Sequence, residues 1–198
     1  TGNPDKTIRN YLVTSDNIFA NCDNGDGFVS VLSITSLGVN YISTNTKNDG
    51  ELTDFQMKYM DLRFSSICNM KCRSCGPLFS TSWSSEAKRK IINDYAPATL
   101  DQIDLSQCKK VYFAGGEPLM NPQHYNVLEM LIAQKAKPTL MYSTNLTITA
   151  YKDKKVTDLW KHFDSINLHA SIDAVGKHAE IVRSGTDWNI VESNLAWI

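Results

Sequence analysis

The spacing of apolar residues changes at about residue 55 of the chain. Beyond it, short apolar runs alternate with longer segments in which apolar residues recur at helical spacing. Short apolar runs favour strands, and helical spacing favours amphipathic helices. The predicted strands cover residues 58–64, 110–114, 138–142 and 166–172, and the predicted helices cover residues 82–94, 121–135, 155–163 and 188–197.

Two helix starts have recognisable capping residues. Thr81 or Ser82 is expected to cap the first helix, because hydroxyl side chains accept bonds from free N–H groups there. Pro122 suits the first turn of the second helix, where its missing N–H is not needed. Trp160 and Trp188, at helical spacing, are expected in the core, and His169 on the fourth strand could face the lumen of a barrel.

The order of these elements predicts the fold class. Alternating strands and helices favour parallel strands joined by helical crossovers. Four such βα units fit within residues 55–198, which predicts an α/β core, either a doubly wound sheet or part of a parallel barrel. In both, ligands bind beyond the carboxyl ends of the strands.

Residues 1–54 form a poorly specified N-terminal extension, with one apolar stretch at 28–42 and a polar linker at 43–53. We expect a hairpin inside this extension. Residues 22–33 partly resemble a calcium-binding loop, but Cys22 and Ser33 stand where Asp and Glu are required. We therefore expect a plain turn there.

Composition excludes several functions. The net charge of −1 gives no electrostatic case for nucleic acid or an anionic membrane. No apolar run approaches the roughly 18–20 residues of a membrane span. The polar start does not resemble a signal peptide. The sequence ends inside a predicted helix, so we expect the natural protein to continue.

Cysteines supply the first candidate chemistry. Three of five lie within eight residues, at Cys68, Cys72 and Cys75, directly after the first strand of the core. An odd count with tight clustering favours a metal centre in a reducing cytoplasm over disulfides. Cys22 and Cys108 are isolated and are expected to be free or buried thiols.

The CxxxCxxC spacing favours an iron–sulfur cluster. Three thiolates can hold three irons and leave the fourth open to a ligand from outside the protein. A zinc site with a fourth ligand elsewhere remains an alternative, although structural zinc prefers paired CxxC or Cys/His spacing.

Two segments together resemble the radical S-adenosylmethionine (SAM) superfamily. Residues 61–75 (DLRFSSICNMKCRSC) resemble its opening motif, and residues 113–118 (FAGGEP) resemble the GGEP motif after its second strand. The resemblance covers residues 58 to about 190. It implies a partial parallel (β/α) barrel of the radical SAM type, truncated after about four βα units.

The resemblance also implies ligands and their positions. Cys68, Cys72 and Cys75 would hold a 4Fe–4S cluster, and the amino and carboxylate groups of SAM would chelate its fourth iron. Two glycines and one acid of the GGEP motif would line the SAM amino group, and polar residues at the next strand ends would contact its ribose and carboxylate. These predicted SAM-binding residues are Gly115, Gly116, Glu117, Ser143, Asn145, Ser171, Asp173 and Arg183.

Ordinary structural roles remain open for the last five of these residues. Ser and Asn side chains also cap helices, and an Arg also pairs with a surface acid. The sequence departs from the family pattern at Ser74, where many members have an aromatic residue packing on adenine. The fifth and sixth strands of the usual barrel are missing as well.

The resemblance implies an enzyme that cleaves SAM reductively to a 5′-deoxyadenosyl radical, which abstracts hydrogen from an unidentified substrate. The sequence resembles in particular members with a C-terminal SPASM or twitch auxiliary-cluster domain, often peptide modifiers. This implies a peptide or protein substrate and a one-electron donor such as a flavodoxin or ferredoxin. The alternative is a non-catalytic iron–sulfur module for cluster binding or electron transfer.

Overall fold

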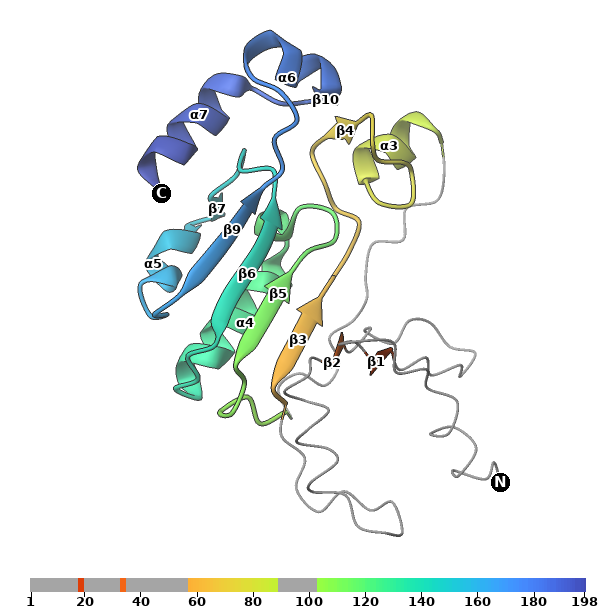
Figure 1. Ribbon diagram of the computed structural model, residues 1–198. Helices are drawn as coiled ribbons and strands as arrows, with labels where there is room; N and C mark the ends of the chain where they lie inside the picture. Colours follow the sequence, from red (N-terminus) through yellow and green to blue (C-terminus); the bar gives the residue numbers. More distant parts are fainter. Residues whose placement is uncertain (1–17, 20–32, 35–56, 89–102) are drawn as a thin grey trace, which may run out of the picture.

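The computed structural model describes residues 18–19, 33–34, 57–88 and 103–198 (Figure 1). The core begins with β3 (Tyr59–Leu62), β4 (Lys71–Cys72), α3 (Thr81–Glu86), β5 (Lys110–Phe113), η2 (Pro118–Met120), α4 (Pro122–Ala133) and β6 (Thr139–Thr144). It continues with β7 (Ala150–Tyr151), β8 (Lys154–Lys155), α5 (Val156–Trp160), β9 (Ile166–Ala170), α6 (Gly176–Val182), β10 (Arg183–Ser184) and α7 (Trp188–Trp197).

A four-stranded sheet in the order β3-β5-β6-β9 forms the centre of the molecule. All three neighbouring pairs are parallel, and one row of the register runs Asp61, Tyr112, Met141, Asn167. Each strand is followed in the chain by at least one helix. This confirms the predicted α/β fold with parallel strands, and it is consistent with part of a (β/α) barrel.

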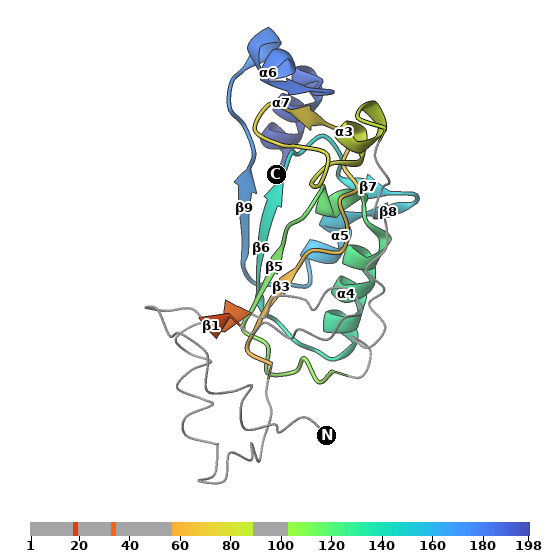
Figure 2. The ribbon, with the colours of Figure 1, turned by 90° about the vertical axis from the view of Figure 1, so that its right-hand side faces the viewer.

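The two faces of the sheet differ because successive side chains of a strand point in opposite directions. One face carries fully buried side chains such as Val111, Phe113 and Leu140. Helices α4 and α5 cover this face (Figure 2). The other face carries half-buried or exposed residues, with His169 among the exposed ones.

Helix α4 shows how the sequence builds the covered face. The Asn121 side chain caps it by accepting a bond from the Gln123 N–H, and Pro122 occupies the first helical position, as predicted. Its buried side chains include Val127, Leu128 and Leu131, at the 3–4 residue spacing of one helix face. Within the described parts of the chain, no helix has the length and apolarity to cross a bilayer.

The prediction for the first helix is wrong at both ends. The cap is Ser80, whose hydroxyl accepts a bond from the Trp83 N–H, so the helix begins at Thr81. The helix ends at Glu86, earlier than predicted, and Lys88 then has a positive φ of 49°. Residues 89–94 lie outside the described residues.

Several short elements are absent from the sequence prediction: α6, η2, the antiparallel β7–β8 pair and the antiparallel β4–β10 pair. Trp160 is buried, as expected. Trp188 is half-buried and lines a pocket, so placing it in the core was wrong.

In the N-terminal extension, β1 (Ile18–Phe19) pairs with β2 (Ser33–Ile34) in antiparallel orientation, in agreement with the expected hairpin. Cys22 and most of the calcium-like segment lie outside the described residues. The boundary at residue 54 stays a prediction.

Candidate functional site

The predicted motifs all lie at the carboxyl ends of the four parallel strands (Figure 1). The cysteine loop follows β3, the GGEP segment follows β5, residues 143–145 end β6, and residues 171–173 follow β9. Because parallel strands end at the same edge of a sheet, the fold brings these distant segments together.

The start of α3 holds the first cysteine in place. The Thr81 hydroxyl lies 3.1 Å from the Cys68 N–H, and the Ser82 hydroxyl donates to the Cys68 carbonyl at 2.8 Å. These bonds hold the backbone of Cys68 and do not involve its thiol.

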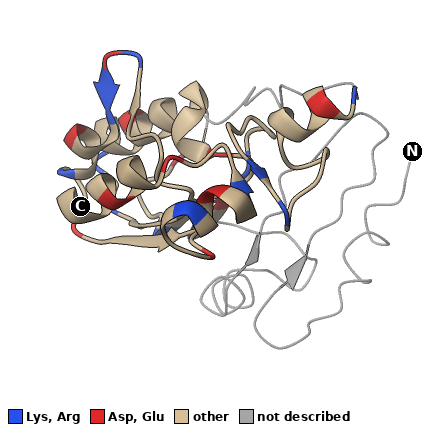
Figure 3. Cartoon of the chain, turned by 90° about the horizontal axis from the view of Figure 1, so that it is seen from above, with Lys and Arg blue, Asp and Glu red and all other residues tan. Residues whose placement is uncertain are grey.

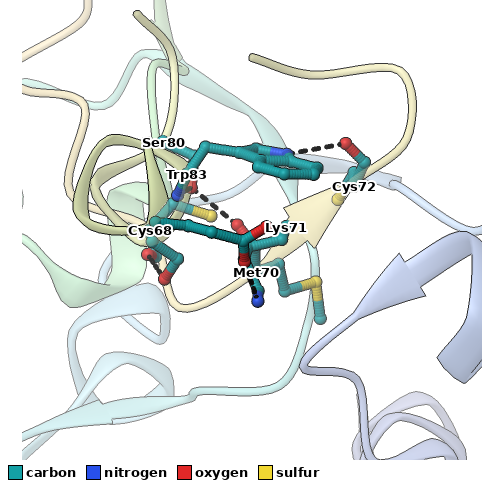
Figure 4. A network of polar contacts seen from close by, with 8 residues as sticks. Cys68, Met70, Lys71, Cys72, Ser80 and Trp83 are labelled. Carbon is teal, nitrogen blue, oxygen red and sulfur yellow. Dashed lines mark hydrogen bonds and ion pairs between the residues drawn. The ribbon is translucent and has the colours of Figure 1, made fainter. Parts of the chain in front are cut away.

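The rest of the loop is anchored by the same helix. The Ser80 hydroxyl donates to the Met70 carbonyl at 2.6 Å, and the Trp83 indole N–H donates to the Cys72 carbonyl at 2.9 Å. Figure 4 shows these two bonds. Sequence reasoning missed these anchoring residues, although a hydroxyl-rich helix start after a cysteine motif could have indicated them.

The three cysteines span a range of exposure. Cys68 is half-buried, Cys72 is buried and Cys75 is exposed. Burial raises the pKa of Cys68 to about 11 and also raises the pKa of Cys72. Binding of iron therefore has to displace protons from these thiols.

Among the described residues, no three His, Cys, Asp or Glu side chains converge closely enough to hold a single metal ion. A 4Fe–4S cluster offers each thiolate a different iron, so its ligands need not converge on one point. Three thiols on one anchored loop fit three irons of such a cluster and leave the fourth without a protein ligand from this loop.

Close packing around the GGEP segment leaves no room for a side chain at its two glycines. A Cβ on Gly116 would lie 2.2 Å from the Ile67 carbonyl oxygen, and one on Gly115 would lie 3.0 Å from the Ser65 carbonyl oxygen. Gly115 also has a φ of +112°. The glycines thus let this segment pack against the chain entering the cysteine loop, whereas sequence reasoning assigned them to close approach of a ligand.

Glu117, the acid of this segment, is buried and only 2% exposed. Its carboxylate accepts bonds from the Leu119 N–H at 3.2 Å, the Thr144 hydroxyl at 2.7 Å and the Asn145 N–H at 2.7 Å. Burial raises the pKa of Glu117, and these donors oppose that rise. The acid therefore ties the end of β5 to the end of β6.

Asn145 extends this network to the cysteine loop. Its amide donates to the Asn69 side-chain oxygen at 3.0 Å, and Asn69 in turn donates to the Thr147 hydroxyl at 2.9 Å. Asn69 lies between the first two cysteines and was not predicted from sequence.

A small hollow that is partly open to solvent lies beside this network, with a cavity volume of about 10 Å³. Three predicted SAM-binding residues line it, Asn145, Ser171 and Arg183, together with the Met70 side of the cysteine loop. Asp173 joins them through Arg183, whose Nε lies 2.9 Å from its Oδ2, although the N–H is not aligned for a hydrogen bond. The structure thus brings four of the predicted residues together.

Ser143 lies apart from this group. Its hydroxyl lies 2.7 Å from the Tyr112 hydroxyl. Cys108 is buried, and its thiol donates to the Lys110 carbonyl at 3.4 Å, as expected for a free buried thiol.

Charges of both signs are interspersed over the described part of the chain when it is viewed from the strand ends (Figure 3).

Comparison with known proteins decides the family. The family model of the radical SAM superfamily matches residues 62–198, which include the cysteine loop and every strand-end segment described above. The chain belongs to the radical SAM superfamily. Members of this class of enzymes bind a 4Fe–4S cluster and SAM.

One curated relative of this radical SAM chain is the GTP 3′,8-cyclase of Streptomyces coelicolor. It is 32% identical over 89 residues, which are 43% of this chain. The matched part spans 26% of the length of that relative.

Proposed function

We propose that this chain is the catalytic core of a radical SAM enzyme. Cys68, Cys72 and Cys75 would hold the 4Fe–4S cluster, and SAM would reach its fourth iron. The supporting observation is that the anchored cysteine loop and the pocket lined by Asn145, Ser171 and Arg183 share the residue Met70 and the same end of the sheet.

Within this proposal, each protein group has a defined task. Arg183 carries five N–H donors in a planar fork, so those not facing Asp173 suit the SAM carboxylate. Ser171, Asp173 and Asn145 would contact the ribose or the amino acid moiety. Ser143, whose hydroxyl lies 2.7 Å from the Tyr112 hydroxyl, would also contact SAM.

The backbone of Gly115 and Gly116 would line the amino group of SAM. Glu117 would contribute less by touching SAM than by holding the Asn145 backbone, since three protein donors already occupy its carboxylate. When bound, the cluster and SAM supply reductive cleavage to methionine and a 5′-deoxyadenosyl radical that abstracts a substrate hydrogen.

The substrate class belongs to the proposal as well. Resemblance to members with a SPASM or twitch domain supports a peptide or protein. The match to a GTP 3′,8-cyclase supports a nucleotide as the second candidate. We further propose a flavodoxin or ferredoxin as electron donor and a reducing cytoplasm as the location, because the thiols have to remain reduced.

The test is an anaerobic assay for 5′-deoxyadenosine. The chain is reconstituted with iron and sulfide, reduced with dithionite and mixed with SAM. We expect 5′-deoxyadenosine from the wild type and from Cys108→Ala, but none from Cys72→Ala. A chain that assembles a cluster yet leaves SAM intact is the alternative, a non-catalytic cluster-binding module.

The same assay ranks the two substrate classes. GTP and a peptide library are added in separate reactions, and the yield of 5′-deoxyadenosine is compared with that from SAM alone. Stimulation by peptides alone supports the preferred class, and stimulation by GTP alone overturns it.

A further inference from the structure

The β10 segment is fastened to the cysteine loop along its backbone. In the antiparallel β4–β10 pair, Arg183 is paired with Cys72 and Ser184 with Lys71. The Arg73 N–H adds a bond to the Val182 carbonyl at 2.9 Å. A segment more than 100 residues further along the chain therefore fixes the middle of the cysteine loop.

The residues after β10 continue this contact. Gly185 has a φ of +102°, and a Cβ there would lie 2.8 Å from the Asn69 carbonyl oxygen. The Thr186 hydroxyl lies 3.7 Å from the Met70 sulfur and donates to the Arg183 carbonyl at 2.7 Å. The close approach holds the Arg183 backbone against the loop.

The Arg183 side chain points at a sulfur atom. Its Nη1 donates to the Cys72 Sγ at 3.4 Å, while its Nε lies 2.9 Å from Asp173 Oδ2. The Arg183 side chain is 16% exposed and Cys72 is 8% exposed. A charged donor beside a sulfur in such a partly desolvated place interacts with it far more strongly than it would in water.

We propose that Arg183 is a positioning residue for the cluster, which donates a hydrogen bond to the Cys72 thiolate and raises the reduction potential of the cluster. This rests on the proposed function, since it needs the cluster to be bound by the three cysteines. Reduction adds negative charge to the cluster and its sulfurs, so a nearby cation and a bond to sulfur favour the reduced form. Asp173 moderates the effect because its carboxylate offsets part of the positive charge.

The test is a redox titration of the reconstituted chain, followed by electron paramagnetic resonance in the absence of SAM. Without SAM, any role of Arg183 in SAM binding does not enter the result. Arg183→Met removes both the charge and the donor, and we expect its potential to fall by about 59 mV, a tenfold change in the one-electron equilibrium. Arg183→Lys keeps the charge without the guanidinium and should fall in between.

Two further variants sharpen the test. Asp173→Asn removes the opposing charge and should shift the potential in the opposite direction, toward less negative values. Lys137→Met removes one positive charge before β6, at the other end of the sheet, and should leave the potential unchanged. If Arg183→Met assembles no cluster, the proposal is tested by the other two variants: the reduction potential should fall in Arg183→Lys and rise in Asp173→Asn.

Equal potentials in the wild type, the Arg183 variants and the Asp173 variant would overturn the role of Arg183 while leaving the proposed function intact. A wild-type chain that binds no iron would instead overturn the proposed function itself.

Discussion

The strand-end region and the helix-covered core each contain a buried ionisable side chain, and the two side chains differ in how many hydrogen-bond partners surround them. At the strand ends, Glu117 receives three protein donors from two segments. In the core, His124 is fully buried, and its ring has one polar contact among the described residues, from its Nε2 to the Tyr142 hydroxyl at 2.9 Å. The strand-end region is thus held by polar bonds between distant segments, and the core mainly by apolar packing.

The core contact continues beyond His124. The Trp160 indole N–H donates to the same Tyr142 hydroxyl at 3.0 Å. The other ring nitrogen, His124 Nδ1, is a buried atom without a hydrogen-bond partner among the described residues. Phe113 stacks on Tyr142 with ring centroids 5.0 Å apart, which completes the apolar surroundings.

The largest expected effect comes from opening the core. Leu140 is fully buried between neighbouring strands, and Leu140→Ala should lower the free energy of unfolding by about 2–5 kcal/mol, because it creates a cavity. Denaturant titration of the apo chain measures this loss. Ile181→Ala, at a side chain that is 59% exposed, is the control and should change little. A Leu140 variant as stable as this control would contradict the claim that apolar packing in the core stabilises the folded chain.

The next effect comes from the strand-end network. Glu117→Gln turns one acceptor oxygen into a donor, which then faces a protein N–H or O–H. We expect a loss of about 1–3 kcal/mol in unfolding free energy, the usual cost of a buried unsatisfied polar group, together with weaker SAM binding. Glu180→Gln, at an exposed position on α6, is the matched control. Unchanged stability and SAM affinity in the Glu117 variant would contradict the account of this network.

Low pH should destabilise the folded chain through the buried His124. Burial lowers the pKa of His124 from 6.5 to about 3, so the unfolded chain binds a proton in this range that the folded chain does not. Stability due to His124 is therefore complete above pH 6.5 and is lost as the pH falls toward 3, by up to about 1.4 kcal/mol per pH unit. Unfolding curves between pH 7 and 5 measure the slope, which His124→Gln should flatten and the exposed His178→Gln should not. Equal slopes in all three proteins would show that His124 is not kept neutral.

The smallest expected effect concerns one bond of the loop anchor. Trp83→Phe keeps the ring but loses the N–H that donates to the Cys72 carbonyl. We expect a loss of about 0.5–1.5 kcal/mol in unfolding free energy and faster removal of iron by a chelator. Trp197→Phe, at a side chain that is 58% exposed, serves as the control. Identical rates of iron loss would mean that the indole does not stabilise the loop.

The sequence predicted the elements that have a strong local pattern. The four parallel strands, α4 and α7 follow from apolar spacing, and the start of α4 follows from Pro122. The sequence did not predict α6 or the short pairs β4–β10 and β7–β8. Two-residue strands are too short to show a periodicity, and α6 buries only Ala179, so it has no apolar face to recognise.

The candidate site was predictable in composition but not in contacts. Motif spacing picked out the cysteines, the GGEP segment and the polar strand ends. It could not reveal that Asn69 bonds Asn145 or that Arg183 reaches Cys72, because each contact joins residues 76 to 111 positions apart. Only the register of the folded chain sets such contacts.

The most direct test of the central claim is the electron paramagnetic resonance spectrum of the reduced, reconstituted chain with and without SAM. A cluster held by Cys68, Cys72 and Cys75 has one iron open to SAM, so we predict a cluster signal that changes when SAM is added. The signal should be lost on replacing any of these cysteines by Ala and should persist in Cys108→Ala. A signal that SAM leaves unchanged, or that survives loss of Cys72, would contradict the claim.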